Sequence, residues 1–330
     1  MKEDSKPLIV TIQCFTYNHE NYIRQCLDGF VMQKTNFRFE AIVHDDASTD
    51  GTASIIHEYA EKYPDIIKPI YETENQYSKR DGSLTRIMDE HTHGKYIAIC
   101  EGDDYWIDPL KLQKQVDFME SHSDYSMCFT DVVDYYEDKN QFGDKQSRKY
   151  CDYNSKLANC NKESFYNILL GKSRIQTLTV LIRSYLYFKK ESDSVHFMMG
   201  DTQLWLYMSQ VGKIKYLEEC TGVYRIHEGS ASRNRDNYLL FQFSMFEMRV
   251  FYCLKYNYKV PLSIVRNYNK ALASLIFEDV KLDREPLYTM FEMPCLQNML
   301  YKKALTSHNA KIVISLIWKF ESFLSLIFKY

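Results

Sequence analysis

The chemistry of this chain is indicated first by a cluster of carboxylates. Glu101, Asp103 and Asp104 directly follow the apolar run 95–100, which predicts a buried strand. Carboxylates at the end of a buried strand repel one another and are costly to bury. They either cap the next helix or hold a cation, because Mg²⁺ and Mn²⁺ bind carboxylates together with the phosphate oxygens of a substrate. On these residues alone both interpretations stay open.

A second pair of carboxylates, Asp45 and Asp46, follows the apolar run 39–44. A carboxylate in this place can accept a hydrogen bond from a nucleobase N–H or a ribose hydroxyl. The alternative is helix capping in the turn-rich stretch DDASTDGT. Capping explains Asp50 well and Asp46 less well, so Asp46 is the candidate for binding.

Alternating strands and helices must position these polar residues. The apolar runs 8–15, 39–44 and 95–100 predict buried strands, and 66–71 predicts a short edge strand because it contains a proline. Helical spacers between strands predict a parallel α/β sheet. Ligands of such sheets bind beyond the carboxyl ends of the strands. The segments FTYNH, which contributes Tyr17 as a ring to stack on a base, HDDASTD and EGDDYW should therefore meet in one crevice.

The rest of the chain is less regular in pattern. Asp108 and Pro109 predict the N-cap and first residue of a helix. The polar stretch 134–164 predicts a mostly irregular excursion, and 175–183 returns to strand character. From residue 238 onward the pattern is helical and indicates no further strand.

Composition excludes some classes of protein. The 41 basic and 44 acidic residues give a net charge of −3, which does not favour nucleic acid as a partner. The nine cysteines are scattered without a CxxC pair, which predicts free thiols in a reducing compartment and neither a disulfide framework nor a zinc site. No secretory signal and no apolar stretch of about 18 residues is present, so we expect a cytoplasmic protein.

The last segment, 311–330, is apolar but broken by charged residues. Two interpretations stay open for it. It packs on the rest of the protein, or it lies on a membrane surface with its aromatic side chains inserted, as a peripheral contact at the inner face of the membrane.

Three stretches in order, VTIQCFTYNHENYIRQCLDGFVMQ, EAIVHDDASTDGT and GKYIAICEGDDYWIDPLKLQKQVDFM, resemble the family 2 glycosyltransferases of the GT-A fold. The resemblance implies a Rossmann-like, mostly parallel sheet flanked by helices, with a C-terminal helical extension. We expect a nucleotide-sugar-binding half at 1–130, an acceptor-binding and catalytic-base half at 131–235, and the extension at 236–330. The family implies inverting transfer of a sugar from a nucleotide diphosphate donor to a glycan or lipid-linked acceptor, usually with Mn²⁺ or Mg²⁺.

The resemblance also implies roles for individual residues. Asp103 faces the ribose, and Asp104 binds the metal that bridges the diphosphate. The first place of the acidic motif, usually Asp in the family, is Glu in this chain. The nucleobase pocket is lined by Phe15, Tyr17 and Asp46.

Two later stretches complete the expected site. Asp201 alone predicts a helix N-cap, whereas the resemblance makes it the general base that takes the proton of the acceptor hydroxyl. Arg225 and His227 lie two residues apart on a strand-like run, so their side chains share a face and suit diphosphate oxygens, with His227 on the metal. Arg233 and Arg235 would belong to a loop that closes over the donor. Without the resemblance, an ordinary basic surface loop is the alternative.

Two other functions remain open at this point. A sugar nucleotidyltransferase would share the fold class and the metal, but it would need a glycine-rich basic loop after the first strand, and FTYNHEN contains neither Gly nor Lys. A non-catalytic module that binds nucleotide sugars would not need Asp104 and Asp201 together.

Overall fold

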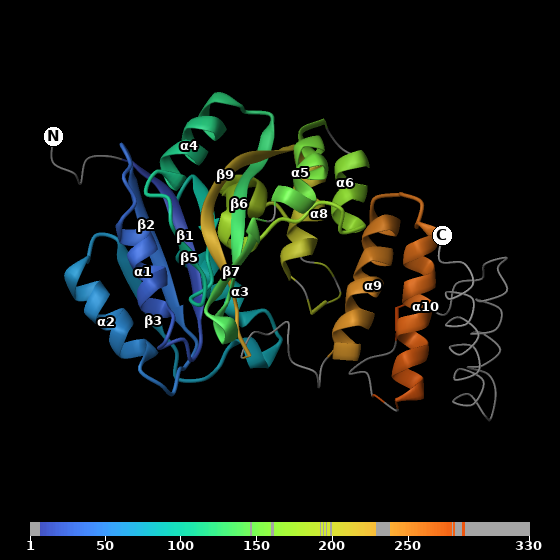
Figure 1. The fold of residues 1–330 in the computed structure, drawn as a ribbon, viewed down its shortest axis with the longest axis horizontal. Helices are drawn as coiled ribbons and strands as arrows, with labels where there is room; N and C mark the ends of the chain where they lie inside the picture. The colour runs from blue at the N-terminus through green and yellow to red at the C-terminus, as the bar shows by residue number, and fades with distance from the viewer. Residues whose placement is uncertain are drawn as a thin grey trace. The chain divides into compact units, whose positions relative to one another are not determined.

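The computed structural model forms two compact units, residues 1–196 with 204–228 and residues 197–203 with 229–330 (Figure 1). The residues that it describes are 7–145, 147–159, 162–191, 193, 195, 197–198, 200–228, 238–278, 280 and 286–287.

A nine-stranded mixed sheet forms the first unit, with the strand order β3-β2-β1-β4-β8-β6-β9-β5 and β7 paired to β6. The strands are β1 (Leu8–Thr16), β2 (Arg38–Asp45), β3 (Ile67–Tyr71), β4 (Tyr96–Ile99), β5 (Tyr105–Trp106), β6 (Tyr125–Tyr136), β7 (Gln141–Lys145), β8 (Val180–Arg183) and β9 (Lys213–Ile226). The first four strands are parallel to one another, β8 is antiparallel to both of its neighbours, and β6 is parallel to β9. The predicted α/β fold is confirmed, and so is the edge position of β3.

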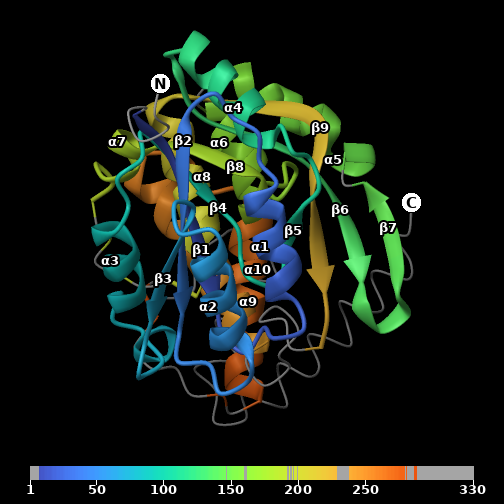
Figure 2. The same ribbon diagram turned by 90° about the vertical axis from the view of Figure 1, so that its left-hand side faces the viewer.

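Helices connect and cover these strands. The helices are α1 (Ile23–Val31), α2 (Thr52–Lys62), α3 (Ser83–Glu90), α4 (Lys111–Ser121), α5 (Ser147–Ser155), α6 (Lys162–Leu169), α7 (Ser184–Tyr187), α8 (Gly200–Val211), α9 (Tyr238–Lys255) and α10 (Leu262–Phe277). Figure 2 shows α1 and α2 in front of the parallel strands. Because each of these two helices connects successive parallel strands, the carboxyl ends of the strands lie at one edge of the sheet.

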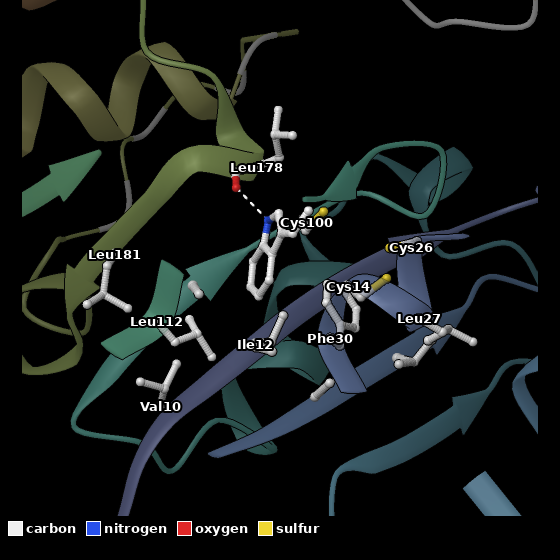
Figure 3. Close-up of a cluster of buried hydrophobic side chains, with 14 of the residues drawn as sticks. Val10, Ile12, Cys14, Cys26, Leu27, Phe30, Cys100, Leu112, Leu178 and Leu181 are labelled. Carbon is white, nitrogen blue, oxygen red and sulfur yellow. Dashed lines mark hydrogen bonds between the residues drawn. The ribbon is translucent and has the colours of Figure 1, made fainter. Parts of the chain in front are cut away.

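The core of the first unit explains why the strands are almost wholly apolar. Val10, Ile12 and Cys14 of β1 are fully buried, as are Leu27 and Phe30 of α1 (Figure 3). A strand covered on both faces has no solvent-facing side, so it shows a continuous apolar run instead of an alternating one.

Tryptophan and cysteine side chains complete this core. The Trp106 indole nitrogen donates to the Leu178 carbonyl at 2.8 Å, the dashed line in Figure 3. Cys26 and Cys100 are fully buried, and each of the seven cysteines in the described part of the chain is a free thiol. This agrees with the prediction of free thiols.

One prediction about the middle of the chain is wrong. The described part of 134–164 is largely ordered: it contains the end of β6, the strand β7 and the helices α5 and α6. The prediction failed because β6 continues as far as Tyr136 through its pairing with Arg225 and neighbouring residues of β9, a contact that local composition does not encode.

The start of α4 also differs from the prediction. The helix begins at Lys111 with Leu110 in the N-cap position, and Asp108 precedes it. Asp108 accepts the Leu110 amide at 2.8 Å, so it closes a turn before the helix. The strand predicted over 175–183 is shorter, because a 3₁₀ turn at Thr177–Thr179 precedes β8.

The second unit contains the helices α9 and α10, in agreement with the predicted helical pattern after residue 238. Among the described helices, none combines the length and the apolar character that crossing a membrane requires. The predictions for Arg233, Arg235 and the segment 311–330 lie outside the described residues.

Candidate active site

The carboxyl ends of three parallel strands meet, as the sequence predicts. Thr16 of β1 lies in register with Asp45 of β2, and the Asp46 amide donates to the Thr16 carbonyl at 3.0 Å. The Gly102 amide, after β4, donates to the Phe15 carbonyl at 2.9 Å. The three polar segments that follow these strands are therefore neighbours.

The acidic turn after β4 depends on a close approach to β1. A Cβ atom on Gly102 would lie 2.7 Å from the Thr16 side chain, so only glycine fits here without a shift. The turn is closed by a hydrogen bond of 3.1 Å from the Asp104 amide to the Glu101 carbonyl. The positions of Asp103 and Asp104 are thus fixed against the end of β1.

Asp103 and His227 form the central pair of the site. The Asp103 Oδ2 atom lies 3.0 Å from the His227 Nε2 atom. Burial raises the pKa of Asp103, but the hydrogen bond with His227 and the nearby His19 imidazole outweigh it and hold the pKa below its ordinary value. The Tyr22 ring packs against His227, with 4.7 Å between ring centroids. Asp103 is therefore an ionised carboxylate beside an imidazole nitrogen, a donor set that Mn²⁺ accepts.

His19 is a member of this cluster that sequence reasoning missed. Its Nδ1 atom lies 3.1 Å from the Thr16 hydroxyl, and its ring centroid lies 6.5 Å from that of His227. Burial lowers the pKa of His19, although the charge of Asp103 acts in the opposite direction. The only signal in the sequence is the place of His19 directly after the first strand, where ligand-binding residues gather.

Asp104, the residue after Asp103, makes a different contact. Its Oδ1 atom accepts the Arg225 backbone amide at 2.8 Å, and the side chain is buried. Burial, together with the charges of Asp103 and Glu101, raises the pKa of Asp104 well above its usual range. The sequence predicted Asp104 and His227 as metal ligands, but the structure brings His227 to Asp103.

The Arg225 side chain is buried and bonded to other protein groups. It is 5% exposed. The Nε atom donates to the Asp103 carbonyl at 2.8 Å, the second terminal nitrogen donates to Gln25 at 2.6 Å, and the first forms an ion pair with Glu137. Its predicted contact with the donor stays a prediction.

The two aspartates after β2 also differ from each other. Both carboxylate oxygens of Asp46 accept backbone amides, from Gln76 at 2.6 Å and from Tyr77 at 3.0 Å. The Oδ1 atom of Asp45 is buried with no hydrogen-bond partner, and burial raises the pKa of Asp45 in spite of hydrogen bonds from Ser48. Asp45 is thus an acceptor with unused capacity that sequence reasoning passed over.

Exposed tyrosines adjoin this second pair. Tyr17 follows the end of β1 and is 45% exposed, and Phe15 is half-buried in the same strand end. Tyr71, which is 44% exposed, lies in register with Asp45, and Tyr77 is 65% exposed. Tyr71 and Tyr77 were not predicted from the sequence, because the place of Tyr71 depends on the pairing of β2 with β3 and that of Tyr77 on the bond from its amide to Asp46.

Asp201 lies in the first turn of α8. Its Oδ1 atom accepts the Thr202 amide at 2.5 Å, and burial raises its pKa. The helix begins one residue earlier, at Gly200, and the Asp201 carboxylate accepts an amide of its first turn. Its role as general base stays a prediction.

Among the described residues, no group of three or more His, Cys, Asp or Glu side chains is arranged to hold a metal ion.

Comparison with protein families identifies the family of this chain. The model of glycosyl transferase family 2 matches residues 12–197, more than half of the chain. The chain belongs to glycosyl transferase family 2. It is therefore a member of a family of transferases.

Relatives within this family have diverse descriptions. An uncharacterized protein of Mycobacterium tuberculosis is 37% identical over 220 residues, which cover 66% of this chain and 59% of that protein. This chain thus matches less than two thirds of that relative's length. The glucosyltransferase WfaP of Escherichia coli, described as UDP-Glc:alpha-D-GlcNAc-diphosphoundecaprenol beta-1,3-glucosyltransferase, is 27% identical over 237 residues, 71% of this chain and 84% of its own.

Solved structures share the fold. TarS of S. aureus, residues 1–349 in complex with UDP-GlcNAc, has a TM-score of 0.55 at 17% identity and covers 84% of this chain and 77% of its own. The mannosyltransferase PcManGT of Pyrobaculum calidifontis, in complex with GDP-Man and Mn²⁺, has a TM-score of 0.51 at 16% identity and covers 99% and 92%. The predicted GT-A fold of this family 2 glycosyltransferase is confirmed.

Proposed function

We propose that this chain transfers a sugar from a nucleoside diphosphate sugar to an acceptor hydroxyl, with inversion. The observation that carries the proposal is the pair Asp103 and His227, 3.0 Å apart at the carboxyl edge of a family 2 sheet. Ligands of open α/β sheets bind at this edge. The ligands named for TarS and PcManGT, UDP-GlcNAc and GDP-Man, are nucleoside diphosphate sugars and support this class of donor.

A divalent cation, Mn²⁺ or Mg²⁺, fits the proposed donor site. Asp103 and His227 would hold it, and diphosphate oxygens would complete its ligand set, as is usual where a protein supplies only one or two ligands. When bound, the cation would offset negative charge on the leaving nucleoside diphosphate. In this proposal Asp103 takes the metal role that the sequence suggested for Asp104, and Asp104 fastens the turn to β9 through the Arg225 amide.

The nucleoside would occupy the end of the site near β2 and β3. Asp45 has a buried oxygen without a partner, which suits the N–H of a base or a ribose hydroxyl. Aromatic rings from the segments around this strand end suit stacking on a base; these rings are the half-buried Phe15 and the exposed Tyr17, Tyr71 and Tyr77. Asp46 would act indirectly, because its carboxylate anchors the Gln76 and Tyr77 amides.

Asp201 would act on the acceptor. In a single displacement the acceptor oxygen bonds to the anomeric carbon while the bond from that carbon to the diphosphate oxygen breaks. The electron pair of the broken bond leaves with the nucleoside diphosphate, and the acceptor proton passes to the Asp201 carboxylate. Burial raises the pKa of Asp201 above its ordinary value, which strengthens it as a base.

The acceptor would be a glycan or a lipid-linked precursor of a surface polysaccharide. The description of WfaP names a diphosphoundecaprenol acceptor, and TuaG of Bacillus subtilis, 28% identical over 233 residues, is described as a putative teichuronic acid biosynthesis glycosyltransferase. Such an acceptor would place the work of this enzyme at the cytoplasmic face of a membrane.

The test is turnover of a panel of UDP-, GDP- and dTDP-sugars with Mn²⁺ by the full chain and by Asp201→Asn. A general base contributes about 10²- to 10⁴-fold, so we expect turnover to fall by that factor while donor affinity is kept. Unchanged turnover would move the base elsewhere, with Glu219 and Glu228 as the next candidates. Donor binding without hydrolysis or transfer in the wild type would favour a non-catalytic module instead.

A further inference from the structure

Arg225 lies at the centre of a buried cluster that the proposed transfer does not use directly. Its guanidinium carbon lies 4.8 Å from the centroid of the Tyr22 ring, 5.3 Å from that of Tyr105 and 5.5 Å from that of Tyr135. Each of these distances is within the range of a cation–π interaction. The rings come from the segment before α1, from β5 and from β6, so the cluster joins three parts of the first unit.

The hydrogen bonds of Arg225 converge on the acidic turn. Its backbone amide donates to the Asp104 carboxylate, and its side-chain Nε donates to the Asp103 carbonyl, both at 2.8 Å. Its other nitrogens bind Gln25 of α1 and Glu137, which follows β6. One residue of β9 therefore holds both consecutive aspartates and ties them to two further elements.

We propose that Arg225 is a positioning residue that fixes the Asp103 peptide so that the Asp103 carboxylate stays aligned with His227 to bind the donor. This inference rests on the proposed function of Asp103. A charged donor to a carbonyl forms a stronger hydrogen bond than a neutral one. The planar guanidinium donates in three directions at once, which a lysine ammonium on a flexible stem does not reproduce.

The same cluster also orients His227. The Tyr22 ring that packs under the Arg225 guanidinium packs against the His227 ring as well. Displacing Arg225 would thus disturb both members of the pair, the carboxylate through the Asp103 peptide and the imidazole through Tyr22. Second-layer partners of this kind typically change metal affinity by about 10- to 100-fold when they are lost.

The environment of Arg225 distinguishes this role from direct contact with the diphosphate. The side chain is almost wholly buried, and each of its three nitrogens donates to a protein acceptor. Glu137 neutralises its charge. A residue that bound the diphosphate directly would compete with Glu137, so removal of the Glu137 charge separates the two roles.

The experiment measures the affinity of UDP and of GDP in the presence of Mn²⁺, together with Tm, for Arg225→Lys and Glu137→Gln. Two matched controls come from the same unit. Arg183 is a buried arginine that also donates to backbone carbonyls, those of Tyr125 and Met119, and the exposed Glu58 pairs with Arg24. Arg183→Lys controls for loss of a buried guanidinium, and Glu58→Gln for loss of an ion pair.

We expect Arg225→Lys to weaken Mn²⁺-dependent nucleotide affinity about 10- to 100-fold and Glu137→Gln to weaken it less. Arg183→Lys should lower Tm but keep affinity, and Glu58→Gln should change neither. If Arg225→Lys does not fold, the nucleotide affinity of Glu137→Gln alone tests the inference.

Three results would overturn the inference. Wild-type affinity in folded Arg225→Lys and Glu137→Gln would show a purely structural role. Tighter binding in Glu137→Gln would show direct contact of Arg225 with the diphosphate. In both cases loss of binding in Asp103→Asn would leave the proposed function standing. If the wild type binds neither nucleotide with Mn²⁺, the proposed function fails together with the inference.

Discussion

Two aspartate pairs, Asp45–Asp46 after β2 and Asp103–Asp104 after β4, are built on the same plan. In each pair the second carboxylate accepts backbone amides from a distant segment: Asp46 from Gln76 and Tyr77, Asp104 from β9. The first carboxylate of each pair is not used in this way. In each pair the second aspartate thus fastens a distant segment, and the first does not.

The pairs differ in what surrounds the first carboxylate. Asp103 has imidazoles beside it, and these hold its pKa below the ordinary value although burial acts in the opposite direction. Within the described part of the chain, the Asp45 carboxylate has hydrogen bonds from Ser48, and burial raises its pKa. On this difference we propose cation binding at Asp103 and binding of neutral N–H or O–H groups at Asp45.

The largest predicted effect is a difference in turnover between variants of Asp103 and of Asp104, the pair after β4. Asp103→Asn should lower turnover about 10²- to 10³-fold, the usual cost of removing a group that stabilises developing charge. Asp104→Asn keeps an acceptor for the Arg225 amide, so it should lower turnover far less. Steady-state kinetics over a range of Mn²⁺ concentrations measures both, and equal losses in the two variants would contradict the division of roles.

A smaller predicted effect distinguishes Asp45 from Asp46, the pair after β2: the first should change donor affinity and the second thermal stability. Asp45→Ala should weaken donor binding by about 1–3 kcal/mol without changing Mn²⁺ affinity, because a buried partner of the nucleoside is lost. Asp46→Ala should mainly lower Tm, since it removes the acceptor of two backbone amides. Calorimetric titration and thermal unfolding measure these quantities. A larger affinity loss in Asp46→Ala than in Asp45→Ala would return base recognition to Asp46, as the sequence suggested.

The smallest predicted effect is on the pH dependence of stability, through Asp45. Because the pKa of Asp45 is raised in the folded protein, its contribution to stability is present below the unfolded pKa and is lost as the pH rises through the folded pKa. Asp45→Asn should therefore lose less stability than the wild type between pH 4 and neutrality, an interval that begins at about the ordinary pKa of aspartate. Denaturant unfolding at several pH values measures the difference.

Glu58 provides the control of opposite sign. Arg24 lowers the pKa of Glu58, so the contribution of this pair is present above the unfolded pKa and is lost as the pH falls. Glu58→Gln should therefore lose less stability than the wild type as the pH falls. Identical pH profiles for Asp45→Asn and the wild type would show that the Asp45 carboxyl is as well solvated in the folded chain as in the unfolded one.

The predictable and unpredictable parts of the fold differ in the range of the interactions that determine them. The strands β1, β2 and β4 are recognisable because burial on both faces makes them continuous apolar runs. The two-residue strand β5 exists through its pairing with Gly222 and Val223 of β9, which no local pattern reveals.

The same distinction applies to the site. The sequence predicted that the polar segments after β1, β2 and β4 are neighbours, since parallel strands bring their carboxyl ends together. It did not identify which aspartate of each pair is held by backbone amides, because those partners lie 30 residues from Asp46 and 121 residues from Asp104 along the chain. The ion pair of Arg225 with Glu137, 88 residues away along the chain, was likewise not predicted from the sequence.

The central claim is that Asp103 and His227, rather than Asp104, hold a divalent cation together with a nucleoside diphosphate. Electron paramagnetic resonance of Mn²⁺ bound with UDP or GDP tests it directly, because an imidazole ligand couples its nitrogen nucleus to the metal. We predict nitrogen coupling in the wild type and in Asp104→Asn, no coupling in His227→Gln, and no bound Mn²⁺ signal in Asp103→Asn. Undiminished coupling in His227→Gln, or Mn²⁺ binding lost in Asp104→Asn but kept in Asp103→Asn, would contradict the account.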